Sequence, residues 1–173
     1  MSGWKIALII IGSIAALILA FLALGAYANG LTDKKYKEAF KNYKEDCDEV
    51  SEYFLDISDS ECLYYLHRDE EFNLHIELVG IEESTEIELP KELKKKIDQI
   101  RKVFDQVTHA GTPNFIKVTD NYVIFYEDGY YGAMIYTRDS SLEKSVKNKW
   151  CEKEYQRLHK LDKHWYSVYV DLI

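Results

Sequence analysis

A long uncharged segment lies at the start of this chain. No Asp, Glu, Lys or Arg occurs from Ile6 to Ala28, and most of the residues there are Ile, Leu and Ala. As an α-helix this segment would be about 34 Å long, which exceeds the roughly 30 Å hydrocarbon core of a bilayer. An α-helix pairs its own backbone polar groups, so lipid does not leave them unsatisfied. The sequence therefore predicts a short tail at residues 1–5 and one transmembrane helix at residues 6–28, with the lipid bilayer as a partner.

The residues at the ends of this segment indicate whether it stays in the protein as an anchor or is cleaved off as a signal peptide. Trp4 and Tyr27 stand near its two ends, where amphipathic rings favour the headgroup region of a membrane. Ala26-Tyr27-Ala28 has the small-x-small form that precedes a signal-peptidase cut, so a secreted protein cleaved after Ala28 is the alternative. The apolar run is longer than the roughly 7–15 residues usual in signal peptides, which favours an uncleaved anchor.

The charges that follow the segment concern its orientation. Lysine occurs at Lys34, Lys35, Lys37, Lys41 and Lys44, and such an excess normally stays in the cytoplasm. The short N-terminal tail, the secretory form of residues 26–28 and the acidic, tyrosine-rich remainder favour the opposite orientation. We therefore predict a single-pass membrane protein whose C-terminal domain lies outside the cytoplasm.

A second helix is predicted to begin after the helix-stopping pair Asn29-Gly30, with Thr32 as its cap. Its apolar residues recur every three or four positions and form one stripe. The stripe consists of Tyr36, Phe40, Tyr43, Cys47, Val50, Phe54 and Ile57. Such a stripe either packs on a sheet or joins two chains as a coiled coil. Its aromatic residues favour the sheet, which leaves a homodimer through the Tyr36–Ile57 helix as the alternative.

The rest of the chain mixes helix and strand patterns. Pro90 precedes a helix with an apolar stripe that starts at Leu93, and Ser140 has capping-box spacing for another helix that continues irregularly to Leu158. We predict one α+β domain over residues 29–173, with a mainly antiparallel sheet of about five or six strands and two or three amphipathic helices. The strand patterns cover residues 62–68, 72–79, 114–119, 121–127, 130–138 and 164–172.

The charge of the chain limits its partners. Asp and Glu number 30 against 22 Lys and Arg, for a net charge of −8. Nucleic-acid phosphates need a basic surface, so nucleic acid is excluded as a partner. An acidic domain instead attracts a protein with a basic surface.

No pattern typical of a catalytic site occurs in the chain. There is no GxSxG and no glycine-rich phosphate loop, and the acidic pairs fall in turns and on wet helix faces. His67, His75 and Glu77 come nearest to a metal site, but His67 shares a strand face with Leu63 and Tyr65, and the sequence does not match that face to the one of His75 and Glu77. We predict no cofactor and no metal. A membrane-anchored hydrolase that uses a carboxylate or a His/Glu metal site is the alternative function.

The three cysteines have neither redox nor zinc-finger spacing. In an oxidising compartment Cys47 and Cys62 could close a short loop and leave Cys151 free, although other pairings are equally open from the sequence. In a reducing compartment all three would be buried thiols.

Tyrosine is the most suggestive residue type, with 14 in the chain. Its ring and hydroxyl suit both half-buried sheet faces and binding surfaces. Tyr130 and Tyr131, next to the Asp128-Gly129 hairpin turn, are the predicted exposed binding pair. The sequence thus favours a membrane-anchored, non-catalytic binding domain, of the kind found in inhibitors, immunity-type proteins and accessory subunits of envelope complexes.

Overall fold

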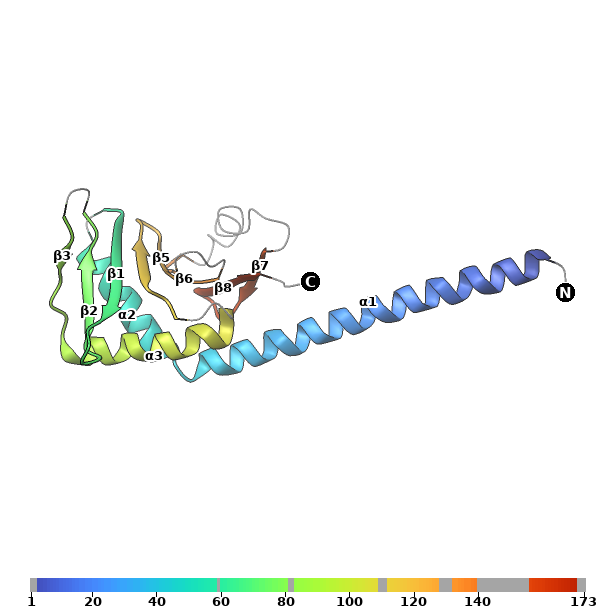
Figure 1. The fold of residues 1–173 in the computed structure, drawn as a ribbon, viewed down its shortest axis with the longest axis horizontal. Helices are drawn as coiled ribbons and strands as arrows, with labels where there is room; N and C mark the ends of the chain where they lie inside the picture. The colour runs from blue at the N-terminus through green and yellow to red at the C-terminus, as the bar shows by residue number, and fades with distance from the viewer. Residues whose placement is uncertain are drawn as a thin grey trace. The chain divides into compact units, whose positions relative to one another are not determined.

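The computed structural model describes residues 3–58, 60–80, 83–108, 112–127, 132–139 and 156–170. The chain divides into two compact units, Met1–Lys35 and Tyr36–Ile173. Figure 1 shows the helices and strands of both units.

The apolar N-terminal segment belongs to a long helix, α1 (Gly3–Lys41). The predicted break at Asn29-Gly30 is wrong: one glycine costs a helix interior only about 1 kcal/mol relative to alanine, and the hydrogen bonds on either side can offset that. The apolar residues whose side chains are described, Leu17, Leu19 and Phe21 among them, are exposed.

This helix corrects the first prediction from the sequence. The apolar segment does not end as a separate element, because α1 continues into the lysine-rich residues 34–41. Within the described part of the chain, no helix is both long enough and apolar enough to cross a membrane. The predicted transmembrane helix at residues 6–28, and the single-pass architecture that depended on it, are therefore contradicted.

The predicted amphipathic helix is split in two. α1 ends at Lys41, and α2 (Lys44–Ile57) begins after a turn in which the backbone N–H of Tyr43 donates to the carbonyl of Phe40 over 2.9 Å. The apolar stripe nevertheless faces one core on both sides of the turn. Its buried members are Tyr36, Phe40, Cys47, Val50 and Phe54. These side chains therefore pack inside their own chain.

The sheet is antiparallel throughout and has the order β3-β2-β1-β4-β5-β6-β8-β7. All six predicted strands are present, and two more bring the described strands to 8, so the predicted number was too low. The strands are β1 (Cys62–Arg68), β2 (Leu74–Leu78), β3 (Thr85–Glu86), β4 (Phe115–Val118), β5 (Tyr122–Tyr126), β6 (Ala133–Thr137), β7 (Gln156–Lys160) and β8 (Trp165–Val170).

The two unpredicted strands have weak patterns of their own. β3 has only 2 residues and lies at the edge of the sheet. β7 includes Leu158, which the sequence assigned to the end of a helix, but its residues pair with β8 from Gln156↔Val170 to Lys160↔Tyr166. The predicted start of that helix, at Ser140, lies outside the described residues.

Helices cover one face of the sheet (Figure 1). α3 (Lys91–Thr108) begins directly after Pro90, as predicted, and buries Leu93, Ile97, Ile100, Val103, Phe104 and Val107. Alternate strand residues such as Ile76, Phe125 and Trp165 complete this core. On the other face, residues of β5, β6 and β8 form a second buried cluster that includes Ile124, and this explains why both faces of β5 are apolar.

Candidate binding surface on the sheet

The β1–β2 hairpin brings together residues that the sequence alone did not assign to one face. In the antiparallel register His67 lies directly opposite His75, and Tyr65 lies opposite Glu77. Residues directly opposite each other share a face of the sheet. The sequence did not establish whether His67 shares a face with His75 and Glu77, and the register shows that it does. Alternation within each strand was correct, but the relative phase of two strands depends on the turn that joins them.

An unbroken row of rings crosses this face of the sheet, and we call it the aromatic row. Its members are His75, His67, Tyr65, Phe115 and Tyr126, from β2, β1, β4 and β5. Successive ring centroids are 5.3, 5.4, 5.2 and 5.4 Å apart, in that order. Each side chain is half-buried. Ring pairs at such distances attract one another by about 0.5–1.5 kcal/mol beyond the area that they bury. The row is therefore preorganised and still accessible.

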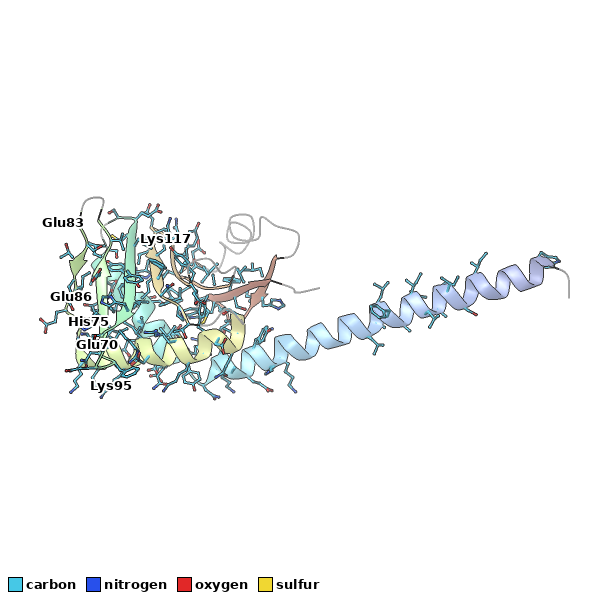
Figure 2. The ribbon with its side chains drawn as sticks, viewed as in Figure 1. Glu70, His75, Glu83, Glu86, Lys95 and Lys117 are labelled. Atoms are coloured by element: carbon cyan, nitrogen blue, oxygen red, sulfur yellow. The ribbon has the colours of Figure 1, made fainter. Side chains whose placement is uncertain are left out.

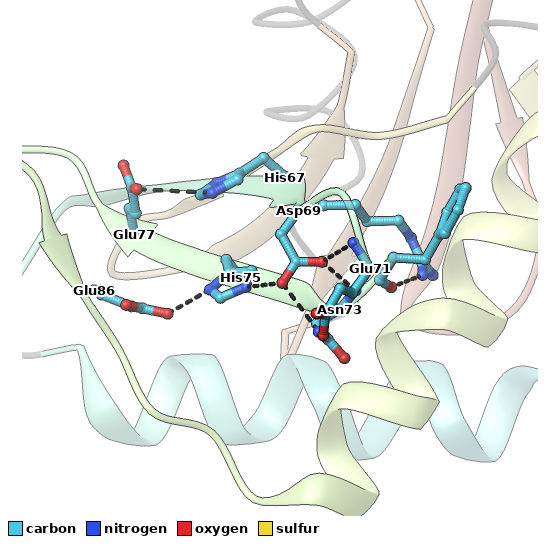
Figure 3. Close-up of polar contacts among 9 residues, drawn as sticks. His67, Asp69, Glu71, Asn73, His75, Glu77 and Glu86 are labelled. Carbon is cyan, nitrogen blue, oxygen red and sulfur yellow. Dashed lines mark hydrogen bonds and ion pairs between the residues drawn. The ribbon is translucent and has the colours of Figure 1, made fainter.

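Two carboxylates hold the His75 end of the row (Figure 3). The Nδ1 atom of His75 lies 2.6 Å from Oε1 of Glu86, and its Nε2 atom lies 3.0 Å from Oδ2 of Asp69. Next to it, Nε2 of His67 lies 3.9 Å from Oε1 of Glu77. An imidazole that faces an acceptor at each nitrogen is best satisfied when it carries both protons.

Asp69 is itself fixed by the hairpin turn. Its carboxylate accepts hydrogen bonds from the backbone N–H groups of Glu71 and Asn73 over 2.9 and 2.8 Å. The turn also holds Phe72 at a φ of 64°, a conformation that non-glycine residues rarely adopt, and the guanidinium of Arg68 donates to the Phe72 carbonyl. The carboxylate beside His75 is thus positioned by the local chain and does not depend on His75 for its place.

These contacts change the proton affinities of the three groups. The hydrogen bond with Glu86, and then that with Asp69, raises the pKa of His75 above its ordinary value. Hydrogen bonds from Asn73 and His75 lower the pKa of Asp69, and the hydrogen bond from His75 lowers the pKa of Glu86. The contacts of the cluster therefore favour the imidazolium form of His75 and the carboxylate forms of Asp69 and Glu86.

This arrangement is unfavourable for a metal ion. A histidine ligand must offer a nitrogen lone pair, whereas both nitrogens of His75 already lie within hydrogen-bond distance of carboxylates. In the part of the chain that the structure describes, no group of three or more His, Cys, Asp or Glu residues has the geometry to hold a metal.

The other residues singled out from the sequence lie elsewhere. Tyr130 and Tyr131, the predicted binding pair, fall outside the described residues, as does Cys151. Cys47 and Cys62 are free thiols, so the short loop considered between them is not closed. Burial, followed by the charges of Asp48 and Asp46, raises the pKa of Cys47, which makes this thiol unreactive.

Comparisons with protein-family models, with curated protein sequences and with solved structures give no match for this chain. Its function is therefore inferred from the geometry and charge of its own residues.

The raised pKa of His75 leads to a first prediction. A group whose pKa is raised by folding contributes stability at pH values below its unfolded pKa, and that contribution is lost as the pH rises through the folded pKa. We therefore expect His75 to titrate in NMR above the value of about 6.5 for a free imidazole, and the melting temperature to fall as the pH rises through that titration.

Glu86→Gln is the matched variant, because it leaves His75 in place and removes only the charge of its first partner. We expect it to lower the pKa of His75 and to weaken the dependence of the melting temperature on pH. On the acid side, the stability from Asp69 and Glu86 is present above their unfolded pKa values and is lost as the pH falls. A His75 titration at or below that of free imidazole would contradict this description of the cluster.

Proposed function

We propose that the unit Tyr36–Ile173 is a non-catalytic binding domain that recognises a protein with a basic surface through the aromatic row and the carboxylates beside it. The observation that carries this proposal is the row itself: rings from four adjacent strands in contact on one sheet face, each half-exposed. A buried core would enclose such rings, whereas a purely solvated face would not place them in a line.

The rings suit the centre of a protein interface. Aromatic residues are enriched in interface cores and among the few residues that contribute most of a binding energy. Stacking already restricts Tyr65, His67 and Phe115, so a partner that covers them loses little further side-chain entropy. The loss of water from their exposed parts then contributes to affinity.

The charges around the row support a basic partner. Glu77 lies beside His67, and Glu86 lies at the edge strand β3. Glu83 and Glu86 lie at the same end of the sheet as His75 (Figure 2), and both are exposed. The whole chain carries −8, so attraction of a basic surface begins before contact.

The electrostatics of the His75 cluster disfavour a carboxyl group as general acid and the imidazole as general base. A general acid needs a carboxyl pKa raised towards neutrality, but the contacts here lower the pKa of Asp69 and Glu86. A general base needs a neutral imidazole, but those same contacts raise the pKa of His75. The contacts therefore favour the charged forms of His75, Asp69 and Glu86.

Affinity capture with the full chain tests the proposed function. We expect the wild-type chain to retain a basic protein whose binding weakens as salt increases, and Phe115→Ala to weaken it about tenfold or more by removing a ring from the middle of the row. Glu77→Lys, which reverses a charge beside the row, is expected to weaken binding and its salt dependence together.

Glu92→Gln is the matched control, because Glu92 is an exposed residue of α3 that pairs with Lys95 and lies away from the sheet face. This variant should retain the partner as the wild type does, and circular dichroism should show that all variants are folded. If no protein is retained in a way that depends on Phe115 and salt, the proposed function is wrong.

A further inference from the structure

A polar groove of about 750 Å³ lies between the end of β1 and helix α3. Three basic side chains line it, Arg68 from β1 and Arg101 and Lys102 from α3, together with the carboxylates of Asp98 and Asp105. We call it the basic groove. It is unusual in a chain with a net charge of −8, because the basic residues outnumber the acidic ones there.

Arg101 has an unsatisfied hydrogen-bond donor that requires an explanation. This side chain is half-buried, and its Nη1 atom is shielded from solvent without a hydrogen-bond partner among the described residues. A buried charged donor without an acceptor is costly, and proteins normally supply one. Arg101 is therefore a guanidinium with an unused, shielded hydrogen-bond donor at the groove.

The carboxylates of the groove do not supply that acceptor. Asp98 accepts a hydrogen bond from Nη2 of Arg68 over 2.6 Å, and that guanidinium also donates to a backbone carbonyl. Burial, and then the positive charge of Arg68, lower the pKa of Arg101, and the attraction of Asp98 is smaller than either effect. The guanidinium groups of Arg68 and Arg101 are thus both attracted to the same carboxylate, that of Asp98.

Lys102 adds a third positive charge. It has no ion pair with any described residue, and its ammonium donates only to Oε1 of Gln99, over a long 3.3 Å. By contrast Lys95, on the same helix, lies 2.7 Å from Oε1 of Glu92. Lys102 is therefore less well compensated than Lys95.

We propose that the basic groove binds a phosphate group carried by a small molecule. A guanidinium presents its donors in a planar fork that matches phosphate oxygens, and a lysine adds a point charge. Arg68 and Arg101 come from different elements, so they can approach one phosphate from two sides. When the Arg101 side chain turns towards the groove, a phosphate oxygen would also provide the acceptor that its Nη1 atom lacks.

The chemistry of the surroundings restricts the ligand to a small one. A nucleic acid needs basic residues along its whole length, whereas this chain is acidic outside the groove. The groove has the volume of a small-molecule site, which is typically about 300–1,000 Å³. The inference does not depend on the aromatic row, which lies on the other face of the sheet from α3.

Titration calorimetry and thermal melting of the full chain test this proposal, with inorganic phosphate, phenyl phosphate and acetate as the three probes. We expect both phosphates to bind and to raise the melting temperature, and acetate to bind at least tenfold more weakly. Tighter binding of phenyl phosphate than of inorganic phosphate identifies a phosphomonoester as the natural ligand class, and equal binding identifies the free ion.

Arg101→Gln is the decisive variant, because it shortens and neutralises the side chain without adding bulk. We expect it to weaken phosphate binding about tenfold or more and to melt, without phosphate, at a temperature equal to or above that of the wild type, because an uncompensated charge is removed. Lys95→Gln, on the same helix but outside the groove, should bind as the wild type does. Binding that is absent in the wild type, or unchanged in Arg101→Gln, or no stronger for phosphate than for acetate, would overturn the proposal.

Discussion

Replacement of Trp165 by alanine is expected to lower the free energy of unfolding by about 3–5 kcal/mol. Trp165 is fully buried, with 0% of its surface exposed. Its ring centroid lies 5.2 Å from those of Phe40 and Tyr136 and 6.1 Å from that of Phe125, so it joins the end of α1 to β5 and β6. The alanine variant would leave a cavity among three rings that cannot all move into it.

The indole N–H adds a polar contribution that a second variant separates. Nε1 of Trp165 donates to Oδ1 of Asp48 over 2.7 Å, and Asp48 is also paired with Lys44 at 2.5 Å. Trp165→Phe keeps a buried ring and removes this donor, so we expect it to cost about 1–3 kcal/mol, less than the alanine variant. Urea unfolding followed by circular dichroism measures both values. An alanine variant within about 1 kcal/mol of the wild type would contradict the central packing role of Trp165.

The helices of the second unit illustrate what the sequence can predict. α3 is found at Lys91–Thr108 because Pro90 marks its start and its apolar stripe has the helical period from Leu93 onwards. In the stripe from Tyr36 to Ile57 the period also predicts most of the side chains that face the core, but Ile57, at the end of the helix, is exposed. The turn at residues 42–43 does not disturb that period, so the sequence pattern gives no signal of the break.

The predicted helix break at Asn29-Gly30 is wrong for a different reason. Asn29-Gly30 is a frequent helix terminator, but the preference is worth only about 1 kcal/mol, and long apolar and lysine-rich helical sequences on either side outweigh it. Local propensity is a weak guide wherever two strong helical segments adjoin.

The candidate surface was only partly predictable for a related reason. Alternation along β1 and β4 already places Tyr65 with His67 and Phe115 with Lys117 on common faces. The row appears only when strand order and register are known, since His67 meets His75 through a register that depends on the hairpin turn. Asp69 and Asn73, at the ends of that turn, were a usable signal, because such residues commonly fix turn geometry.

Phe54→Ala is expected to cost about 3–5 kcal/mol in the free energy of unfolding, whereas Ile57→Ala is expected to cost about 1 kcal/mol or less. Both residues belong to the same apolar stripe of α2, one helical turn apart. Phe54 has 0% of its surface exposed and its ring centroid lies 4.8 Å from that of Tyr64, but 41% of Ile57 is exposed at the end of the helix. Urea unfolding at two protein concentrations measures both variants.

The pair distinguishes the two interpretations of the stripe. If the stripe packs only against its own sheet, the cost of substitution follows the burial seen within one chain, and it does not change with protein concentration. If the stripe instead joined two copies, the partner copy would cover Ile57, and its substitution would cost as much as that of Phe54. At low protein concentration the copies would separate, and the substitution of Ile57 would then cost less than that of Phe54. The burial of Tyr36, Phe40 and Phe54 within one chain favours the first result.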